Sequence, residues 1–198
     1  MDVTTPFQIG PFQTSFIEMI AVLAGLTSVW LMKKEQILAF PFGIINVVIY
    51  VIIFFRSHLY ANAGINAFFA LMSIYGWYNW TRPRPNAGRL SITVCSKMEM
   101  VLNILAGVGF FLLIRWLLIR YTETRLPSWD AFTTAVYILA QWMLSRKKIE
   151  NWILWILSDT VMIGICFVEN LYFSSFQYLV FTIIATLGFL EWRIKLMK

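Results

Sequence analysis

The stretch IENWILWILSDTVMIGICFV, residues 149–168, is long and apolar enough to cross a bilayer, yet it carries a carboxylate near its middle. A helix of about 20 apolar residues spans the hydrocarbon core. A charged side chain at the centre of such a helix costs on the order of 2.5–3.5 kcal/mol, so it normally faces a protein interior or a water-lined path. Asp159 is therefore a candidate functional residue.

Six further apolar segments lie along the chain, which together predict a polytopic membrane protein. Hydrophobic residues make up 60% of the sequence and charged residues 13%, against roughly a quarter charged in soluble domains. Neither alternating strand patterns nor aromatic barrel girdles appear, so the predicted class is all-α with seven spanning helices. The predicted spans are Ser15–Met32, Ile37–Phe55, Leu59–Trp80, Met98–Ile119, Trp129–Leu144, Ile149–Val168 and Leu171–Trp192.

Basic residues follow alternate spans and thereby predict an orientation in the membrane. An excess of lysine and arginine marks the cytoplasmic side, which places the N-terminus outside and the C-terminus in the cytoplasm. This distribution explains the net charge of +6 without a nucleic-acid partner. The predicted cytoplasmic residues are Lys33, Lys34, Arg82, Arg84, Arg89, Lys97, Arg146, Lys147, Lys148, Arg193, Lys195 and Lys198, against Arg56, Arg120 and Arg125 on the other side.

The two halves of the chain share an ordered set of motifs, which predicts an internal repeat. Trp30-Leu-Met-Lys-Lys closes the first predicted span, and Trp142-Met-Leu-Ser-Arg-Lys-Lys closes the fifth. A Leu-Tyr pair opens the third and the seventh, and Asn46 and Asp159 occupy matching places. This pattern indicates a parallel 3+1+3 repeat, as in secondary transporters whose substrate site lies between the halves. The predicted divisions are an N-terminal bundle (1–80), a loop and linker helix (81–128) and a C-terminal bundle (129–198).

Polar and aromatic residues deep in the spans are the candidate ligand contacts. Trp152, Trp155 and Asp159 share one helical face. Indole rings stack on flat ligands and attract cations, and a cationic ligand would balance the carboxylate. A structural role is the alternative for these residues, because polar side chains also join membrane helices and indoles also pack or anchor. The predicted substrate-binding residues are Asn46, Tyr50, Asn66, Asn151, Trp152, Trp155, Asp159 and Tyr178.

Motifs for catalysis or cofactor binding are missing from the sequence. It contains no glycine-rich nucleotide loop, no His-Glu-x-x-His and no His/Cys cluster with metal spacing. An intramembrane aspartyl enzyme needs two carboxylates in one site, and Asp2 and Asp130 lie outside the spans or at an interface. We therefore expect no enzyme activity, no cofactor and no metal.

Three segments resemble the Pnu-type bacterial vitamin transporters: Phe42-Gly-Ile-Ile-Asn46, Ile74-Tyr-Gly-Trp-Tyr-Asn-Trp80 and Glu150-Asn-Trp-Ile-Leu-Trp155. The third resembles the family's Glu-Asn-Trp-x-x-Trp motif, and the resemblance covers nearly the whole chain. It implies a fold related to the SWEET sugar carriers and a homotrimer in the bacterial inner membrane. It also implies uptake of nicotinamide riboside by facilitated diffusion, with a cytoplasmic kinase trapping the vitamin. The implied site includes Asn46, Asn151, Trp152, Trp155 and Asp159.

Two positions depart from the family pattern and leave alternatives open. Asn66 stands where carriers of nicotinamide riboside have glutamine, and Gln177 stands where some have glutamate. Thiamine is therefore the alternative substrate, since it too is a cationic aromatic molecule, whereas riboflavin is neutral. The sequence also leaves open a non-transporting membrane scaffold and proton-coupled transport through Asp159.

Overall fold

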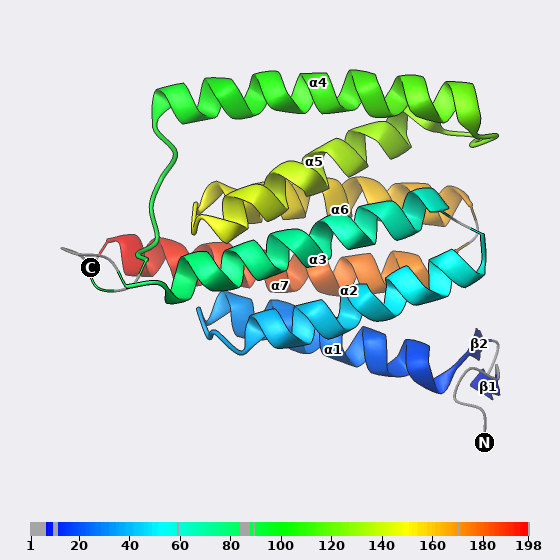
Figure 1. The fold of residues 1–198 in the computed structure, drawn as a ribbon, viewed down its shortest axis with the longest axis horizontal. Coiled ribbons are helices and arrows are strands. Elements are labelled where there is room, and N and C mark those ends of the chain that lie inside the picture. The colour runs from blue at the N-terminus through cyan, green and yellow to red at the C-terminus, as the bar shows by residue number, and fades with distance from the viewer. Residues whose placement is uncertain are drawn as a thin grey trace. The chain divides into compact units, whose positions relative to one another are not determined.

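The computed structural model is built from seven α-helices in the part of the chain that it describes, residues 7–9, 12–58, 60–83, 88, 90–169 and 171–197 (Figure 1). Every predicted span is confirmed as a helix. Leu59, Arg84, Arg89 and Lys198 of the repeat and charge arguments, and Asp2, lie outside the described residues. The helices are α1 (Phe16–Lys33), α2 (Ala39–Arg56), α3 (Tyr60–Thr81), α4 (Lys97–Tyr121), α5 (Pro127–Ser145), α6 (Glu150–Val168) and α7 (Tyr172–Leu196).

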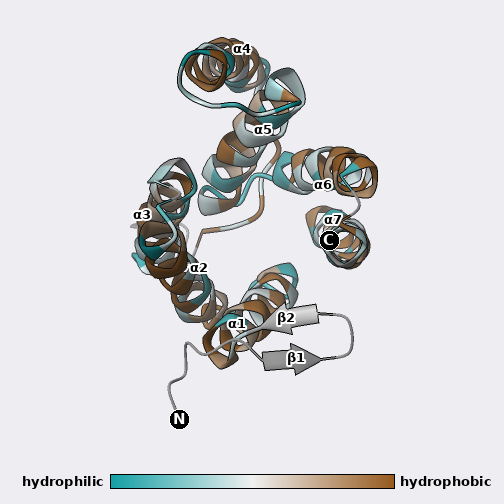
Figure 2. Ribbon diagram, turned by 90° about the vertical axis from the view of Figure 1, so that its right-hand side faces the viewer, coloured by the Kyte–Doolittle hydropathy of each residue, from teal (hydrophilic) through white to brown (hydrophobic). Residues whose placement is uncertain are grey.

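Four of the described helices, α1, α2, α4 and α6, are long and apolar enough to cross a membrane on length and composition alone. Amide, hydroxyl and aromatic side chains lower the hydropathy of α3, α5 and α7, which are equally long. Hydrophobic residues dominate α4 in Figure 2, and none of its residues is buried. Because lipid is the surrounding solvent for such a protein, exposed apolar side chains are expected on its helices.

The chain divides into two compact units, residues 1–81 and 82–198. In the first unit α2 packs against α1 and α3, and in the second α5 packs against α4 and α6, which in turn packs against α7. The predicted linker helix α4 thus contacts α5 directly. Their approach is close, because a Cβ added at Gly107 would lie 2.8 Å from Leu139 Cδ1.

A short hairpin precedes α1, and the sequence analysis did not predict it. Strands β1 (Phe7–Ile9) and β2 (Phe12–Thr14) pair antiparallel, with Phe7 opposite Thr14. Ser15 then caps α1, since its hydroxyl accepts a hydrogen bond from the Glu18 N–H at 3.3 Å. Ser15 therefore lies just outside the helix, as N-cap serines do.

The turns that follow α1 and α5 have matching backbone structure at positions 112 residues apart. Glu35 and Lys147 have φ angles of 57° and 52°, a conformation that is uncommon for residues other than glycine. Backbone hydrogen bonds match as well: Gln36 N–H donates to Leu31 O, and the Lys148 N–H donates to Met143 O, both at 3.0 Å. At this spacing Asn46 corresponds to Ser158, so the sequence-based pairing of Asn46 with Asp159 is displaced by one residue.

Each unit contains an aromatic pair, and the two pairs are also 112 residues apart in the sequence. Phe40 meets Trp80 edge to face at 5.0 Å and 89°, and Trp152 meets Trp192 at 5.4 Å and 88°. All four side chains are at most 2% exposed. Each pair joins the start of one helix to the end of the helix that follows it, α2 to α3 or α6 to α7, and edge-to-face rings are a favourable arrangement.

Candidate functional site

The candidate residues of α6 lie on one face of the helix, and that face is buried. The opposite face carries Ile153 and Leu157, which are 49% and 43% exposed. Residues that recur every three to four positions share a side of a helix. The buried face consists of Asn151, Trp152, Ser158 and Asp159, none more than 3% exposed, together with the partly buried Trp155.

Tyr137 on α5 contacts this face at two points. Its hydroxyl donates a hydrogen bond to Asp159 Oδ1 at 2.8 Å, and its ring lies 5.2 Å from the Trp155 ring at an interplanar angle of 40°. Hydrogen bonds to ionised groups are stronger than those between neutral groups, so Tyr137 stabilises the carboxylate. Sequence reasoning missed Tyr137. The available signal was its phenol within an apolar run, since a buried tyrosine hydroxyl needs a partner.

Three consecutive residues at the start of α6 bury polar atoms that have no hydrogen-bond partner among the described residues. These atoms are Glu150 Oε2, Asn151 Oδ1 and Trp152 Nε1. The other amide atom of Asn151 is engaged, because its Nδ2 donates to Lys148 O at 2.5 Å. A buried polar group without a partner costs about 1–3 kcal/mol. A polar ligand that reached these atoms would recover that cost.

The segment before α4 is joined to the turn before α6. Thr93 and Lys148 form a parallel bridge, in which the Thr93 N–H donates to Lys147 O and the Ile149 N–H donates to Thr93 O, both at 3.0 Å. The Cys95 N–H donates to Glu150 Oε1 at 2.7 Å. We call this arrangement, residues 90–96 and Glu99 with residues 147–150, the clasp.

Two lysines of the predicted orientation signal belong to the clasp. Lys147 is 7% exposed, and its ammonium group donates to Leu90 O at 2.9 Å. Lys148 forms an ion pair with Glu99 at 2.8 Å. Burial and the nearby Glu150 carboxylate raise the pKa of the Cys95 thiol to about 11. The thiol is therefore protonated at neutral pH and unsuited to nucleophilic chemistry.

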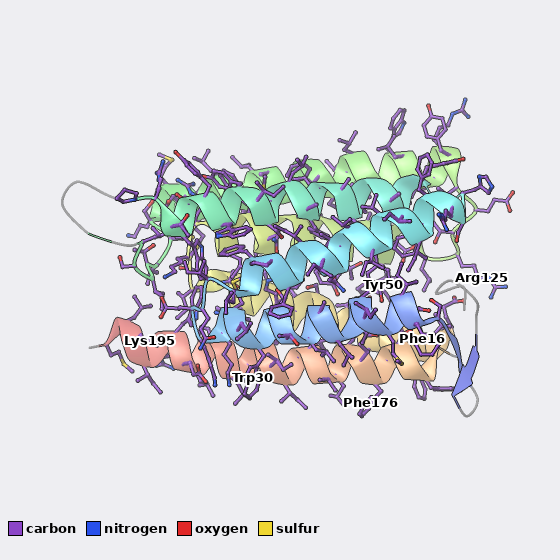
Figure 3. The ribbon with its side chains drawn as sticks, turned by 60° about the horizontal axis from the view of Figure 1, so that its bottom comes forward. Phe16, Trp30, Tyr50, Arg125, Phe176 and Lys195 are labelled. Carbon is purple, nitrogen blue, oxygen red and sulfur yellow. The ribbon has the colours of Figure 1, made fainter. Side chains whose placement is uncertain are left out.

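In the first unit, Asn46 joins two helices. Its Nδ2 donates to Ala21 O of α1 at 2.7 Å, and a Cβ added at Gly25 would lie 2.8 Å from the same nitrogen. Tyr50, labelled in Figure 3, lies one turn further along α2 and stacks on Phe54 at 5.7 Å. The hydrogen bond of Asn46 favours its structural alternative, a link between helices.

Within the second unit, the structure brings four of the predicted site residues together. Asn151, Trp152, Trp155 and Asp159 share the buried face of α6. Tyr178 lies in the same unit on α7, where its carbonyl accepts from Thr182 at 2.9 Å. The candidates of the first unit are on other helices, Asn46 and Tyr50 on α2 and Asn66 on α3, where its Nδ2 donates to Asn62 O at 2.9 Å. Among the residues that the structure describes, no cluster of His, Cys, Asp and Glu is arranged to hold a metal ion.

Comparisons with known proteins match almost the whole chain. A family model described as nicotinamide mononucleotide transporter matches residues 15–194. The nicotinamide riboside transporter PnuC of Escherichia coli (strain K12) is 29% identical over 212 residues, which cover 94% of this chain and 89% of that protein. The riboflavin/roseoflavin transporter RibM of Streptomyces davaonensis is 24% identical, with 90% and 84% covered.

One solved structure shows the same fold. The crystal structure of the vitamin B3 transporter PnuC matches with a TM-score of 0.71 at 21% identity, and the match covers 90% of this chain and 80% of that chain. Each of these relatives is named a transporter, so the comparisons identify membrane transport rather than enzyme catalysis.

Proposed function

Because the chain belongs to the nicotinamide mononucleotide transporter family and is a multi-pass membrane protein, we propose that it carries nicotinamide riboside across the bacterial inner membrane. The name of the Escherichia coli relative supports this substrate. The Streptomyces davaonensis relative is named for riboflavin, so membership of the family does not by itself identify the transported vitamin. The argument for a cationic vitamin comes from the side chains of the site.

The buried face of α6 is the observation that carries the proposal. It combines a carboxylate, two indoles and the unpaired atoms Asn151 Oδ1 and Trp152 Nε1. Asn151 and Asp159 are eight residues apart, about 12 Å along the helix axis. That distance accommodates an aromatic ring and a sugar side by side. Trp155 would stack on the pyridinium ring and Asp159 would balance its charge, while Asn151 and Trp152 would bind amide or hydroxyl groups.

The remaining candidates have weaker support. Tyr178 belongs to the same unit as the α6 face and is a proposed further contact. Tyr50 and Asn66 remain proposed contacts of the first unit. We assign Asn46 to the packing of α1 against α2, because its amide nitrogen already donates to Ala21 O.

We propose that transport proceeds by alternating access and facilitated diffusion. The matched turns and aromatic pairs support an origin of the two units from a duplicated three-helix repeat, the 3+1+3 arrangement related to SWEET carriers. Duplicated transporters alternate by moving one repeat against the other. The excess of basic residues after the odd-numbered helices supports an outer N-terminus and a cytoplasmic C-terminus. A homotrimer and a cytoplasmic kinase that traps the vitamin complete this proposal.

Binding to the purified full-length protein tests the substrate. In isothermal titration, we expect nicotinamide riboside to bind more tightly than thiamine and riboflavin to bind weakly or not at all. Asp159→Asn should weaken the binding of nicotinamide riboside at least tenfold, since the charge pair is lost. Glu169→Gln, at a partly exposed carboxylate just after the last residue of the same helix, should bind as the parent does. A protein that binds none of the three vitamins is better explained as a scaffold. Preferential riboflavin binding would overturn the assigned roles of Asp159.

A further inference from the structure

Tyr137 makes, from within the second unit, both contacts that the proposed function assigns to the vitamin. Its ring lies against Trp155 with centroids 5.2 Å apart, and its hydroxyl donates to Asp159 Oδ1 at 2.8 Å. The Tyr137 side chain and a pyridinium ligand share two features. Each has an aromatic ring, and each has a group that binds a carboxylate. Tyr137 is thus a chemical mimic of the proposed ligand.

The two contacts are incompatible with simultaneous binding of the vitamin to the same groups. Aromatic pairs in contact have centroids about 4.5–7 Å apart, so a separation of 5.2 Å leaves no room for a third ring between Tyr137 and Trp155. Asp159 is 3% exposed, and the Tyr137 hydroxyl covers one of its oxygens. A ligand that stacks on this side of Trp155 and reaches Asp159 must first displace the phenol.

Ser158 offers the displaced hydroxyl a second acceptor. It is the residue before Asp159 on the buried face of α6, and its side chain is fully buried. The Ser158 hydroxyl donates its own proton to Leu154 O at 2.8 Å, which leaves the lone pairs of its oxygen free to accept. The Tyr137 hydroxyl can therefore move from Asp159 to Ser158 without losing a hydrogen-bond partner.

We propose that Tyr137 is an affinity-determining residue of the substrate site, which competes with the vitamin for Trp155 and Asp159 and passes its hydrogen bond to Ser158 when the vitamin binds. The proposal rests on the function argued above. Competition of this kind lowers apparent affinity by the fraction of molecules in which the site is accessible. Removing the competitor should therefore strengthen binding, whereas removing an ordinary wall of the site should weaken it.

The test compares nicotinamide riboside binding to four forms of the full-length protein. Tyr137→Phe should bind about tenfold more tightly than the parent, the value of one hydrogen bond to a charged group, chiefly through faster association. Ser158→Ala should bind roughly fivefold more weakly, because the phenol then loses its second acceptor. In the Tyr137→Phe background, Ser158→Ala should have no further effect. Tyr121→Phe, at the exposed end of α4, is the matched control and should bind as the parent does.

The outcomes separate this proposal from the proposed function. If the parent binds nicotinamide riboside but Tyr137→Phe binds equally well or more weakly, the competition is overturned and the function stands. If the parent binds none of the vitamins, the function fails and the competition fails with it. Tyr137→Leu, which removes ring and hydroxyl together, provides the same comparison if size-exclusion chromatography shows that the phenylalanine variant is misfolded.

Discussion

Gly188 allows the Trp152 indole to lie directly on the backbone of α7. A Cβ at position 188 would come within 2.8 Å of Trp152 Cε2 and Cζ2, a distance that requires something to shift. The indole has little freedom to yield, because it is 1% exposed and packs edge to face on Trp192 at 5.4 Å. Close approach of the backbone at this one position therefore fixes Trp152 in the buried face of α6.

We expect Gly188→Ala to destabilise the protein by about 1–3 kcal/mol, the usual cost of overpacking, and to lower its unfolding temperature. The matched control is Gly164→Ala on α6, where an added Cβ would meet nothing within 4 Å. In a helix that substitution should be neutral or stabilise by up to about 1 kcal/mol. Thermal unfolding of both variants in one detergent measures the difference. Equal melting would show that the contact between Gly188 and Trp152 has no energetic role.

Single residues were predictable from the sequence where depth in a span decided their environment. Asp159 is buried, as the cost of a polar group in lipid requires. Tyr137 was missed because its partner Asp159 lies 22 residues away on another helix. The Asn46 contact with Ala21 spans 25 residues. Helical periodicity describes neighbours on one helix, so it contains no information about contacts between helices.

The clasp is an element that hydropathy could not have predicted. Residues 90–96 have no helical or strand periodicity, yet they pair with a turn some 55 residues further along the chain. Lys147 and Lys148 carry the charge that predicts orientation, and the same two side chains bind Leu90 O and Glu99 in the folded unit. The clasp thereby holds the first residue of α6, Glu150, next to the unpaired atoms of Asn151 and Trp152.

Lys147→Met should destabilise the second unit by about 1–3 kcal/mol, because the Leu90 carbonyl loses a buried charged donor. It should also weaken nicotinamide riboside binding, since the start of α6 is less well held. Lys97→Met removes the same charge from an exposed position in the first turn of α4 and is the control for net charge. Unfolding temperature and titration of both variants measure the effect. If the two variants behave alike, the clasp does not position α6.

The seven-helix order was predictable for the whole molecule because the thickness of a bilayer imposes the length of each span. The predicted spans also agree with the helices α3, α5 and α7 of the structure. Polar and aromatic side chains keep these three below the hydropathy of the other four helices. The hairpin β1–β2 was not predicted, since two strands of three residues fall below the length of any periodic signal. The length and apolarity of segments therefore predict the seven helices, and they contain no signal for short structures between them.

Transport itself is a property of the whole molecule, and the proposed facilitated diffusion makes a strict prediction about it. Sealed vesicles that contain the protein and are loaded with unlabelled nicotinamide riboside should take up the labelled vitamin by exchange, and the label should be recovered chemically unchanged. A carrier without energy coupling equalises the vitamin concentrations inside and outside the vesicle and goes no further. Collapsing the proton gradient should therefore leave both the rate of uptake and the final level of labelled vitamin unchanged.

Slower uptake after the collapse would instead make Asp159 a proton carrier, because a buried carboxylate bonded to a displaceable phenol can exchange a proton when the phenol leaves. Vesicles with the Asp159→Asn variant then test that role, since a carrier that binds its proton at Asp159 should lose its response to the gradient while retaining exchange.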